Sequence, residues 1–272
     1  LASGLYWQGV SNVRIRGGYA ATNDASLPGA RDPAQWPTTV RRDPYFGQMR
    51  IMTIEGVSDG LIEGVALNDG LIATLWGSLY GAGLYVSGCV NLAVATCVFS
   101  NDQVWAQVDT HGGGLYAIAS SLAVSYCLFV RNRAEGTQNS DAHGAGIFFQ
   151  SGSLALTATT IRNNTNQAAW SGNSYGAGLY VGSAATVTAT RCVFALNQTR
   201  RGYRDTSYTG YGGAVANVGT SRVQSCLIYG NDSDSDTGDG IYSVGSLTLE
   251  NSTLVSNGVQ GIWGAGGSLT VT

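Results

Sequence analysis

The sequence of 272 residues contains no Lys: all fourteen basic residues are Arg, and seventeen residues are acidic. Only 11% of the residues are charged and the net charge is −3, which argues against nucleic acid or an anionic membrane as the partner. No apolar run approaches the length of a transmembrane helix, so no membrane span is expected. The four Pro residues fall within residues 28–44 and leave the rest of the chain uninterrupted.

Glycine is the residue in excess: the 39 Gly are about twice the usual share of roughly 7%. Many of them stand in triplets such as "GAG" or "GGG" before an apolar residue that recurs along the chain. These first anchors are Leu84, Leu115, Ile147, Leu179, Val215, Ile241 and Ile262. A second anchor, a small residue, recurs at Cys97, Cys127, Thr159, Cys192, Cys226 and Ser252.

The spacing of these anchors separates each repeat into two halves. From first to second anchor the steps are 11 to 13 residues, whereas from second to next first anchor they range from 10 to 23. Segments such as "SLALTA" and "SLTLEN" alternate apolar and polar residues with period two. Short alternating strands in units of about 20 residues predict coils that stack at roughly 4.8 Å. The predicted fold is all-β, a single-stranded right-handed parallel β-helix (solenoid) with loops of variable length on one side.

Equal offsets within the repeat predict ladders of identical side chains. Cys97, Cys127, Cys192 and Cys226 share one position with Thr and Ser, which favours small, buried, reduced residues, with disulfides between adjacent coils as the alternative. A second ladder follows the next strand, at Asn132, Asn164, Asn197 and Asn231. Asn visits the left-handed region readily, and its amide can bond to the Asn of the next coil. Each Asn is therefore expected to form a corner.

Aromatic residues and His form two further files with equal offsets. One file follows the first anchor: Tyr85, Tyr116, Phe148 and Tyr180. The other precedes it by four residues: Tyr80, His111, His143, Tyr175 and Tyr211. Stacking that stabilises the coils is one interpretation, and an exposed stripe that binds a partner or glycan is the other. The longest variable segment adds a candidate partner contact: Arg200, Arg201, Tyr203 and Arg204.

The segment "NDSDSDTGDG" is the sharpest local signal for a metal. Its alternating carboxylates suggest a calcium site, and the candidate ligands are Asp232, Asp234, Asp236 and Asp239. The closing Glu of an EF-hand is missing, so a solvated acidic loop is the competing interpretation. No other cofactor is predicted.

The Pro-containing stretch at about 21–48 is expected to leave the stack, because Pro cannot donate to a ladder. Its Trp36, Tyr45 and Phe46 are candidate apolar anchors, so we expect it to fold against the rod or to reach across to a neighbouring subunit, with a disordered surface loop as the alternative. Residues 1–272 are otherwise expected to form one domain. The chain starts without Met and stops inside a predicted strand, so we expect it to be a piece of a longer protein.

The repeats "GAGLY…CVFALN" and "GGGLY…CLFVRN" resemble the "GGAI" and "FxxN" repeats of chlamydial polymorphic outer membrane proteins. They are also similar to large bacterial surface proteins of the right-handed parallel β-helix or choice-of-anchor type. The resemblance implies a secreted or cell-surface location and supplies no catalytic residue.

The function expected from the sequence is therefore non-catalytic: an extracellular structural or adhesive surface protein, self-associating or filament-forming. Its expected partners are copies of itself, other surface components or glycans. Two alternatives remain, a polysaccharide lyase or glycoside hydrolase of the β-helix type, and a carbohydrate-binding module. The acidic residues are scattered over the variable segments rather than clustered, which disfavours an enzyme.

Overall fold

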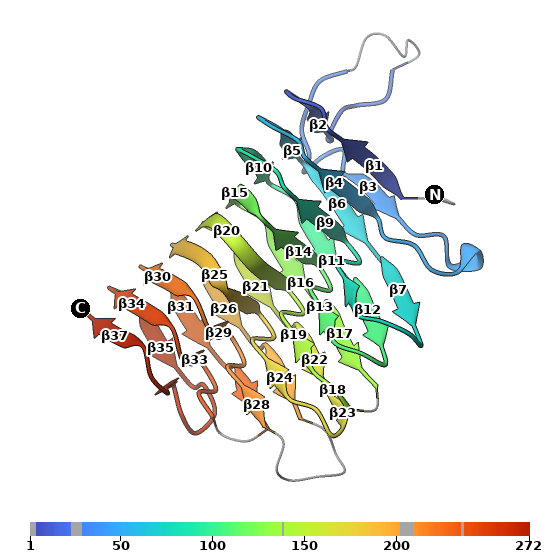
Figure 1. Cartoon of the computed structure of the whole chain (residues 1–272). Helices are drawn as coiled ribbons and strands as arrows, with labels where there is room; N and C mark the ends of the chain where they lie inside the picture. The colour runs from blue at the N-terminus through green and yellow to red at the C-terminus, as the bar shows by residue number, and fades with distance from the viewer. Residues whose placement is uncertain (1–3, 23–28, 138, 202–208, 235–236) are drawn as a thin grey trace.

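The computed structural model describes residues 4–22, 29–137, 139–201, 209–234 and 237–272. In these residues the chain winds through successive coils, and nearly every strand pairs in parallel with its equivalents one coil before and after. Figure 1 shows the coils stacked from β1 to β37. The predicted parallel β-helix with variable loops on one side is confirmed.

The largest sheet has sixteen strands in two rows. The two long strands β20 (Ile147–Thr157) and β25 (Leu179–Thr190) each run through both rows and join them. The first row also contains β1 (Leu5–Gln8), β4 (Met52–Glu55), β9 (Leu84–Ser87), β14 (Leu115–Ile118), β29 (Val215–Asn217), β33 (Ile241–Ser243) and β36 (Ile262–Gly264). The second row also contains β2 (Arg14–Arg16), β5 (Leu61–Glu63), β10 (Leu92–Ala95), β15 (Ser120–Ser125), β30 (Thr220–Gln224), β34 (Ser246–Glu250) and β37 (Ser268–Val271).

The other sheets complete each coil. Eight strands form a third row: β3 (Thr38–Arg41), β6 (Val65–Asn68), β11 (Val98–Ser100), β16 (Leu128–Val130), β21 (Thr160–Arg162), β26 (Val193–Ala195), β31 (Leu227–Tyr229) and β35 (Thr253–Val255). Six form a fourth: β7 (Leu71–Thr74), β12 (Gln103–Ala106), β17 (Arg133–Gly136), β22 (Thr165–Gln167), β27 (Gln198–Arg200) and β32 (Asp232–Ser233). Five short strands form a fifth: β8 (Leu79–Tyr80), β13 (Thr110–His111), β19 (Ala142–His143), β24 (Ser174–Tyr175) and β28 (Gly210–Tyr211).

The variable half of the repeat is thus more ordered than predicted. The segments interpreted as loops contain the strands of the fourth and fifth rows, and only the connection between these rows varies. It grows from three residues in 107–109 to nine in 201–209. In two neighbouring connections β18 (Asn139–Ser140) and β23 (Ala169–Trp170) pair antiparallel.

A buried asparagine ladder joins the coils at the end of the third row. Asn132, Asn164 and Asn197 each donate from Nδ2 to Oδ1 of the next Asn, at 3.0, 2.9 and 2.9 Å. Oδ1 of the accepting Asn also receives the backbone N–H of the donating residue, as Asn164 Oδ1 does from Asn132 N. The other N–H of each Nδ2 donates to a backbone carbonyl one coil back, as from Asn132 to Phe99 O. The side-chain amides of Asn164 and Asn197 therefore each make four hydrogen bonds and tie three coils together.

The left-handed corner was assigned to the wrong residue. The ladder Asn are absent from the residues with positive φ, whereas the residue before each one has it, as at Arg131 (φ 58°) and Leu196 (φ 55°). At the ladder position the Asn side chain points into the interior instead, where its amide bonds to the Asn of the neighbouring coil. The corner accepts Asn, Arg, Leu, Gly or Ser because its side chain is outside the core.

The cysteine ladder works in the same way, with sulfur as a weaker acceptor of the backbone N–H. All five Cys are reduced and buried. Cys97 N donates to Cys127 Sγ at 3.4 Å, and Cys127 N donates to Thr159 Oγ1 at 3.4 Å. The hydrogen-bonded neighbouring thiol and burial together raise the pKa of Cys127. The thiols thus act as small acceptors that a hydroxyl can replace.

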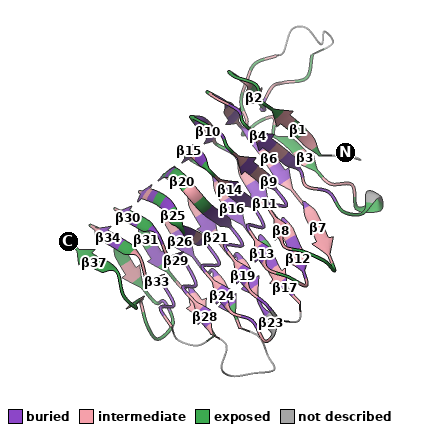
Figure 2. Cartoon of the chain, in the orientation of Figure 1, coloured by how far each residue is buried: buried purple, intermediate pink, exposed green. Residues whose placement is uncertain are grey.

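The interior between these ladders is apolar and continuous. Phe99, Phe129, Ile161 and Phe194 stack in register, with the rings of Phe99 and Phe129 4.4 Å apart. Figure 2 shows buried positions alternating with partly exposed ones along the strands. This alternation is the period-two pattern of the sequence.

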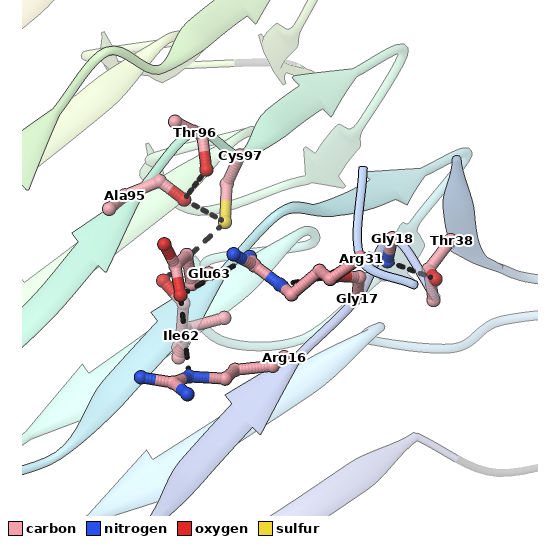
Figure 3. A network of polar contacts seen from close by, with 10 residues as sticks. All are labelled: Arg16, Gly17, Gly18, Arg31, Thr38, Ile62, Glu63, Ala95, Thr96 and Cys97. Atoms are coloured by element: carbon pink, nitrogen blue, oxygen red, sulfur yellow. Dashed lines mark hydrogen bonds and ion pairs between the residues drawn. The ribbon is translucent and has the colours of Figure 1, made fainter. Parts of the chain in front are cut away.

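The predicted excursion at 21–48 needs a correction, because it contains the strand β3 (Thr38–Arg41), which pairs in parallel with β6. The stretch that leaves the stack lies between β2 and β3. Figure 3 shows how it is held: Arg31 Nε donates to Gly17 O at 3.0 Å and its guanidinium lies 3.2 Å from Glu63, while Gly18 N donates to Thr38 Oγ1. After β3 comes the short 3-10 helix η1 (Pro44–Phe46). No helix among the described residues has the length and apolarity of a membrane span.

The asparagine ladder begins with an acid, and this yields a test. Asp102 is buried; its Oδ1 accepts the Gly70 N–H at 2.8 Å, whereas Oδ2 is buried without a hydrogen-bond partner. Burial raises the pKa of Asp102 well above 3.8, so the wild type loses stability as the pH rises through that raised value. We expect Asp102→Asn to increase the free energy of unfolding at pH 7 by about 1–3 kcal/mol.

Urea unfolding followed by circular dichroism at pH 3.5 and pH 7 measures this effect. The gain should shrink towards pH 3.5, where Asp102 is protonated in the folded state and mostly protonated in the unfolded chain. An equal gain at both pH values would contradict the ionisation argument. As a control, Asn164→Asp in the middle of the ladder should destabilise the protein at pH 7.

The first Gly of each triplet provides a second test. Gly144 has φ 55°, and a Cβ there would overlap the Ile147 carbonyl oxygen. Gly77 has φ 86° but open space around it. Gly77→Ala should cost about 1–2 kcal/mol for the left-handed backbone alone. Gly144→Ala should cost measurably more in thermal unfolding, and equal losses would show that the overlap relaxes freely.

Candidate functional site

The two aromatic files form stacked columns beside the variable half of each coil. Column 1 contains Tyr85, Tyr116, Phe148 and Tyr180, with successive ring centroids 5.4, 5.3 and 4.8 Å apart. Column 2 contains Tyr80, His111, His143, Tyr175 and Tyr211, with successive rings 5.1, 4.9, 5.0 and 4.9 Å apart. The strands of the first and fifth rows hold them in register.

The columns pack against each other, which buries Tyr116 and Phe148, whereas the other seven rings are only partly buried. His111 meets Phe148 edge-on at 4.7 Å, and His143 meets Tyr180 at 4.9 Å. Tyr116 is 3% and Phe148 5% exposed. The hypothesis of an exposed aromatic stripe is therefore wrong for these two residues, because each column covers the other. Stacking of this kind contributes about 0.5–1.5 kcal/mol per pair to stability.

Ala216 interrupts column 1, because it occupies the position between Tyr180 and Tyr242 in neighbouring coils and has no ring. Tyr211 of column 2 turns towards this gap and lies 4.6 Å from Tyr242, which in turn stacks on Trp263 at 5.2 Å. The aromatic packing is thus continuous across the missing ring. At the other end Arg50 lies 4.7 Å over the Tyr85 ring and donates to the carbonyls of Gly81 and Tyr80.

Two histidines lie in the middle of column 2, and Nδ1 of each is buried without a hydrogen-bond partner. Burial lowers the pKa of His111 to about 4, although the negative charge of Asp109 acts to raise it. Burial, and then the neighbouring His111, lower the pKa of His143. Both rings are therefore neutral at pH 7, as ring stacking requires.

A ladder of side-chain acceptors borders the variable connections. Asp109 Oδ1 accepts the Asp141 N–H at 3.0 Å, Asp141 Oδ1 accepts the Asn173 N–H at 2.7 Å, and Asn173 Oδ1 accepts the Thr209 N–H at 2.9 Å. Burial raises the pKa of Asp141. The ladder fixes the start of the fifth row whatever the length of the connection before it. We call the connections 75–78, 107–109, 137–141, 168–173 and 201–209 the variable edge.

Part of the predicted Arg cluster lies on this edge. Arg200 Nε donates to Gln198 Oε1, and Arg200 and Arg201 oppose the rise in the pKa of Asp234 that its burial causes. Tyr203 and Arg204 lie outside the described residues.

The calcium hypothesis does not hold for Asp239. Its buried carboxylate already accepts four hydrogen bonds, from the backbone N and hydroxyl of Ser233 and from the backbone N of Val259 and Gln260. Asp232 accepts from Gln198 Nε2. Asp236 lies outside the described residues, and within those residues no three His, Cys, Asp or Glu side chains converge on a metal position. Asp239 is a structural residue that fixes the turn at 258–260.

The structure also shows surfaces that the sequence did not single out. A shallow hollow of about 400 Å³ lies over β10, β15, β20 and β25, lined chiefly by small side chains such as Ala123, Ser153 and Thr188. A second lies beside η1. There Tyr45 is 93% exposed, although it was expected to anchor the excursion, and Trp76 on the variable edge is 84% exposed. The amino-acid composition cannot tell which aromatic residues are exposed, as Tyr45 and Trp76 are, and which pack into the columns.

Comparison with known proteins agrees with this architecture. The family described as "Right handed beta helix region" matches residues 135–272, and the chain belongs to it. No curated protein matches the chain. One solved structure, "Crystal structure of Agl-KA catalytic domain", is similar at 13% identity with a TM-score of 0.35, over 99% of this chain and 53% of that one. The chain thus spans about half the length of that structure.

The paired histidines predict an acid-sensitive step in stability. Because their folded pKa values lie below the unfolded value of 6.5, the unfolded chain binds more protons as the pH falls. Stability should therefore be lost between about pH 6.5 and pH 4. Asp109 and Asp141 and the rings of Tyr80 and Tyr175 surround the pair.

The double variant His111→Tyr, His143→Tyr continues column 2 with the residue type found at both flanks. It should lose this step in a pH series of thermal unfolding, while its stability at pH 8 reports any change in packing. If the acid-sensitive step persists unchanged in the variant, other groups cause it.

Proposed function

We propose that this chain is a non-catalytic structural or adhesive part of a secreted or cell-surface protein, a stiff β-helix that presents its variable edge to a partner. One observation carries the proposal. From β7 to β28 most of the length variation lies in the connections between the fourth and fifth rows, which range from three to nine residues, while ladders and columns hold the adjoining strands in register. Loops on a rigid scaffold are a common arrangement for recognition.

The chemistry of the interior supports the same proposal. The ladder amides make their full set of hydrogen bonds, the thiols are buried, and the columns cover each other. These side chains are used for stacking. The resemblance of the "GAGLY" repeats to bacterial surface proteins supports a location outside the cell. Partners of the edge are copies of this chain, other surface components or glycans.

Deletion of residues 200–208 tests the proposal. The purified chain, coated on beads, should adhere to itself or to bacterial cell surfaces, and the deletion variant should lose most of this adhesion. Its far-ultraviolet circular dichroism should stay nearly unchanged, because the deletion removes only Arg200, the last residue of β27, from the five rows. Loss of β-structure would show that the edge is part of the scaffold.

The enzyme alternative is tested in parallel by incubating the chain with a panel of plant and bacterial polysaccharides. Assays for new reducing ends and for unsaturated products should remain at background. Release that depends on the intact chain would overturn the non-catalytic proposal.

A further inference from the structure

The ladder of buried amides has a direction, and an acid stands at its first position. Every amide from Asn132 to Asn231 donates from Nδ2 to Oδ1 of the next member, and Asn257 closes the series. Asp102 precedes them by one coil, because its backbone N donates to Asn132 Oδ1 at 3.0 Å, as Asn132 N does to Asn164 Oδ1. The first position is therefore one at which the ladder requires a hydrogen-bond donor.

The carboxyl group of Asp102 is oriented as a ladder amide is. Its Oδ1 accepts the backbone N–H of Gly70 at 2.8 Å, in the way that each ladder Oδ1 accepts the N–H of the preceding member. Its Oδ2 lies where an amide has Nδ2. A Cβ on Gly83 would be 2.5 Å from Asp102 Oδ2, and a Cβ on Gly114, the equivalent glycine one coil later, would be 2.9 Å from Asn132 Nδ2. Oδ2 therefore replaces the donor atom of the ladder.

The atoms opposite this position are acceptors. Asn132 Nδ2 donates to Asn164 Oδ1 at 3.0 Å and to Phe99 O at 3.1 Å. Phe99 pairs in register with Leu67, so the equivalent acceptors for Asp102 Oδ2 are Asn132 Oδ1 and Leu67 O. Oδ2 is buried, and no donor of the described residues reaches it. As a carboxylate oxygen it would face other oxygens in the interior, which is costly, whereas as a hydroxyl it has an acceptor.

Turning the Asn132 amide over does not remove this conflict. The reversed amide would present Nδ2 to Asp102 Oδ2, but also to the Asp102 N–H, and its oxygen would face Asn164 Oδ1 and Phe99 O. One contact would be gained and three would be lost, because each of these groups has a fixed role as donor or acceptor. A proton on Asp102 is the arrangement that satisfies every group.

The charges around Asp102 favour the protonated carboxyl. Burial, the largest cause, and the negative charge of Asp69 raise the pKa of Asp102, while the hydrogen bond from Gly70 acts to lower it. Asp102 forms no ion pair within the described part of the chain. On neighbouring segments, the guanidinium of Arg50 is bound to two backbone carbonyls and that of Arg133 to a carboxylate on its own strand. Neither cation is therefore engaged with Asp102.

We propose that Asp102 carries a proton at pH 7 and donates it from Oδ2 to Asn132 Oδ1, so that a neutral carboxylic acid begins the ladder. Asn132 Oδ1 then accepts two hydrogen bonds from Asp102, as Asn164 Oδ1 does from Asn132. Hydroxide removes this proton in alkaline solution and leaves a buried charge that faces two oxygens, which opens the ladder at Asp102. This inference concerns the scaffold and does not rest on the proposed function.

Urea unfolding of the wild type and Asp102→Asn at a series of pH values between about 5 and 8 tests the proton. If folded Asp102 is protonated while the unfolded residue is ionised, unfolding releases one proton. The ratio of the wild-type to the variant unfolding constant then rises with pH, approaching tenfold per unit, and the rise should continue through pH 7. A ratio that levels off below pH 7 would overturn the proposal, because folded Asp102 would then already be ionised.

Carbon NMR of the chain with Asp labelled at the carboxyl carbon reads the proton directly. One carboxyl signal should have the chemical shift of a protonated acid at pH 7, and this signal should be missing from Asp102→Asn. A wild-type spectrum in which every Asp carboxyl has the shift of a carboxylate at pH 7 would contradict the proposal, whatever the stability of the variant.

Hydrogen exchange of two backbone amides reports the opening in alkaline solution. The N–H groups of Gly70 and Asp102 donate to the first two members of the ladder, so their protection in the wild type should fall as the Asp102 carbon signal moves to the carboxylate position. Asp102→Asn should keep its protection over the same pH range. Equal loss of protection in both proteins would show that ionisation of Asp102 does not open the ladder.

Asp59→Asn is the matched control, because Asp59 is an exposed acid at another corner and accepts a hydrogen bond from Asn91 Nδ2 at 3.2 Å. Its unfolding constant should keep a fixed ratio to that of the wild type over the same pH range. A pH-dependent ratio of the same size in this variant would mean that the loss of any carboxylate produces the effect, and the special role of Asp102 would be refuted.

Discussion

Hydrogen bonding between equivalent positions of successive coils is the constraint on which this structure depends. A parallel β-helix has no hairpins, so every backbone group must find its partner one coil away, and one misplaced residue disturbs two neighbours. The buried ladder of Asn132, Asn164, Asn197 and Asn231 makes that register specific, since each amide bonds to the coil before and the coil after. A shift of one residue would leave buried amides unpaired, at about 1–3 kcal/mol for each group.

The glycine triplets follow from the same constraint. Beside the ladder the chain must turn with positive φ at Gly112 and then pass so close to the next coil that a Cβ on Gly114 would lie 2.7 Å from Gly146 O and 2.9 Å from Asn132 Nδ2. Glycine is needed first for its backbone freedom and then for its lack of volume. The aromatic residue that follows each first anchor packs over this glycine turn, as Tyr116 does over Gly81. The rings of column 2 then cover it from the other side, so that Tyr116 and Phe148 are buried.

Equal offsets in the sequence were enough to predict the fold, the two ladders and the two columns, because a stack of coils turns equal offsets into vertical neighbours. They were not enough to say which way a side chain points. The left-handed corner fell one residue before the Asn, as at Arg131, and the columns closed on each other. Tyr45 and Trp76 lie on either side of the contact between Gln48 and Ala73, a contact between distant segments that no local pattern encodes.

The variable edge and the rigid coil depend on each other. A connection of three or nine residues can be inserted between the fourth and fifth rows because the Asp109, Asp141, Asn173 and Thr209 contacts fix where the chain re-enters the stack. Each coil therefore absorbs a change in loop length without passing it to its neighbours. Such a scaffold can change its surface one coil at a time while its core stays constant, which is the property that the proposed recognition function requires.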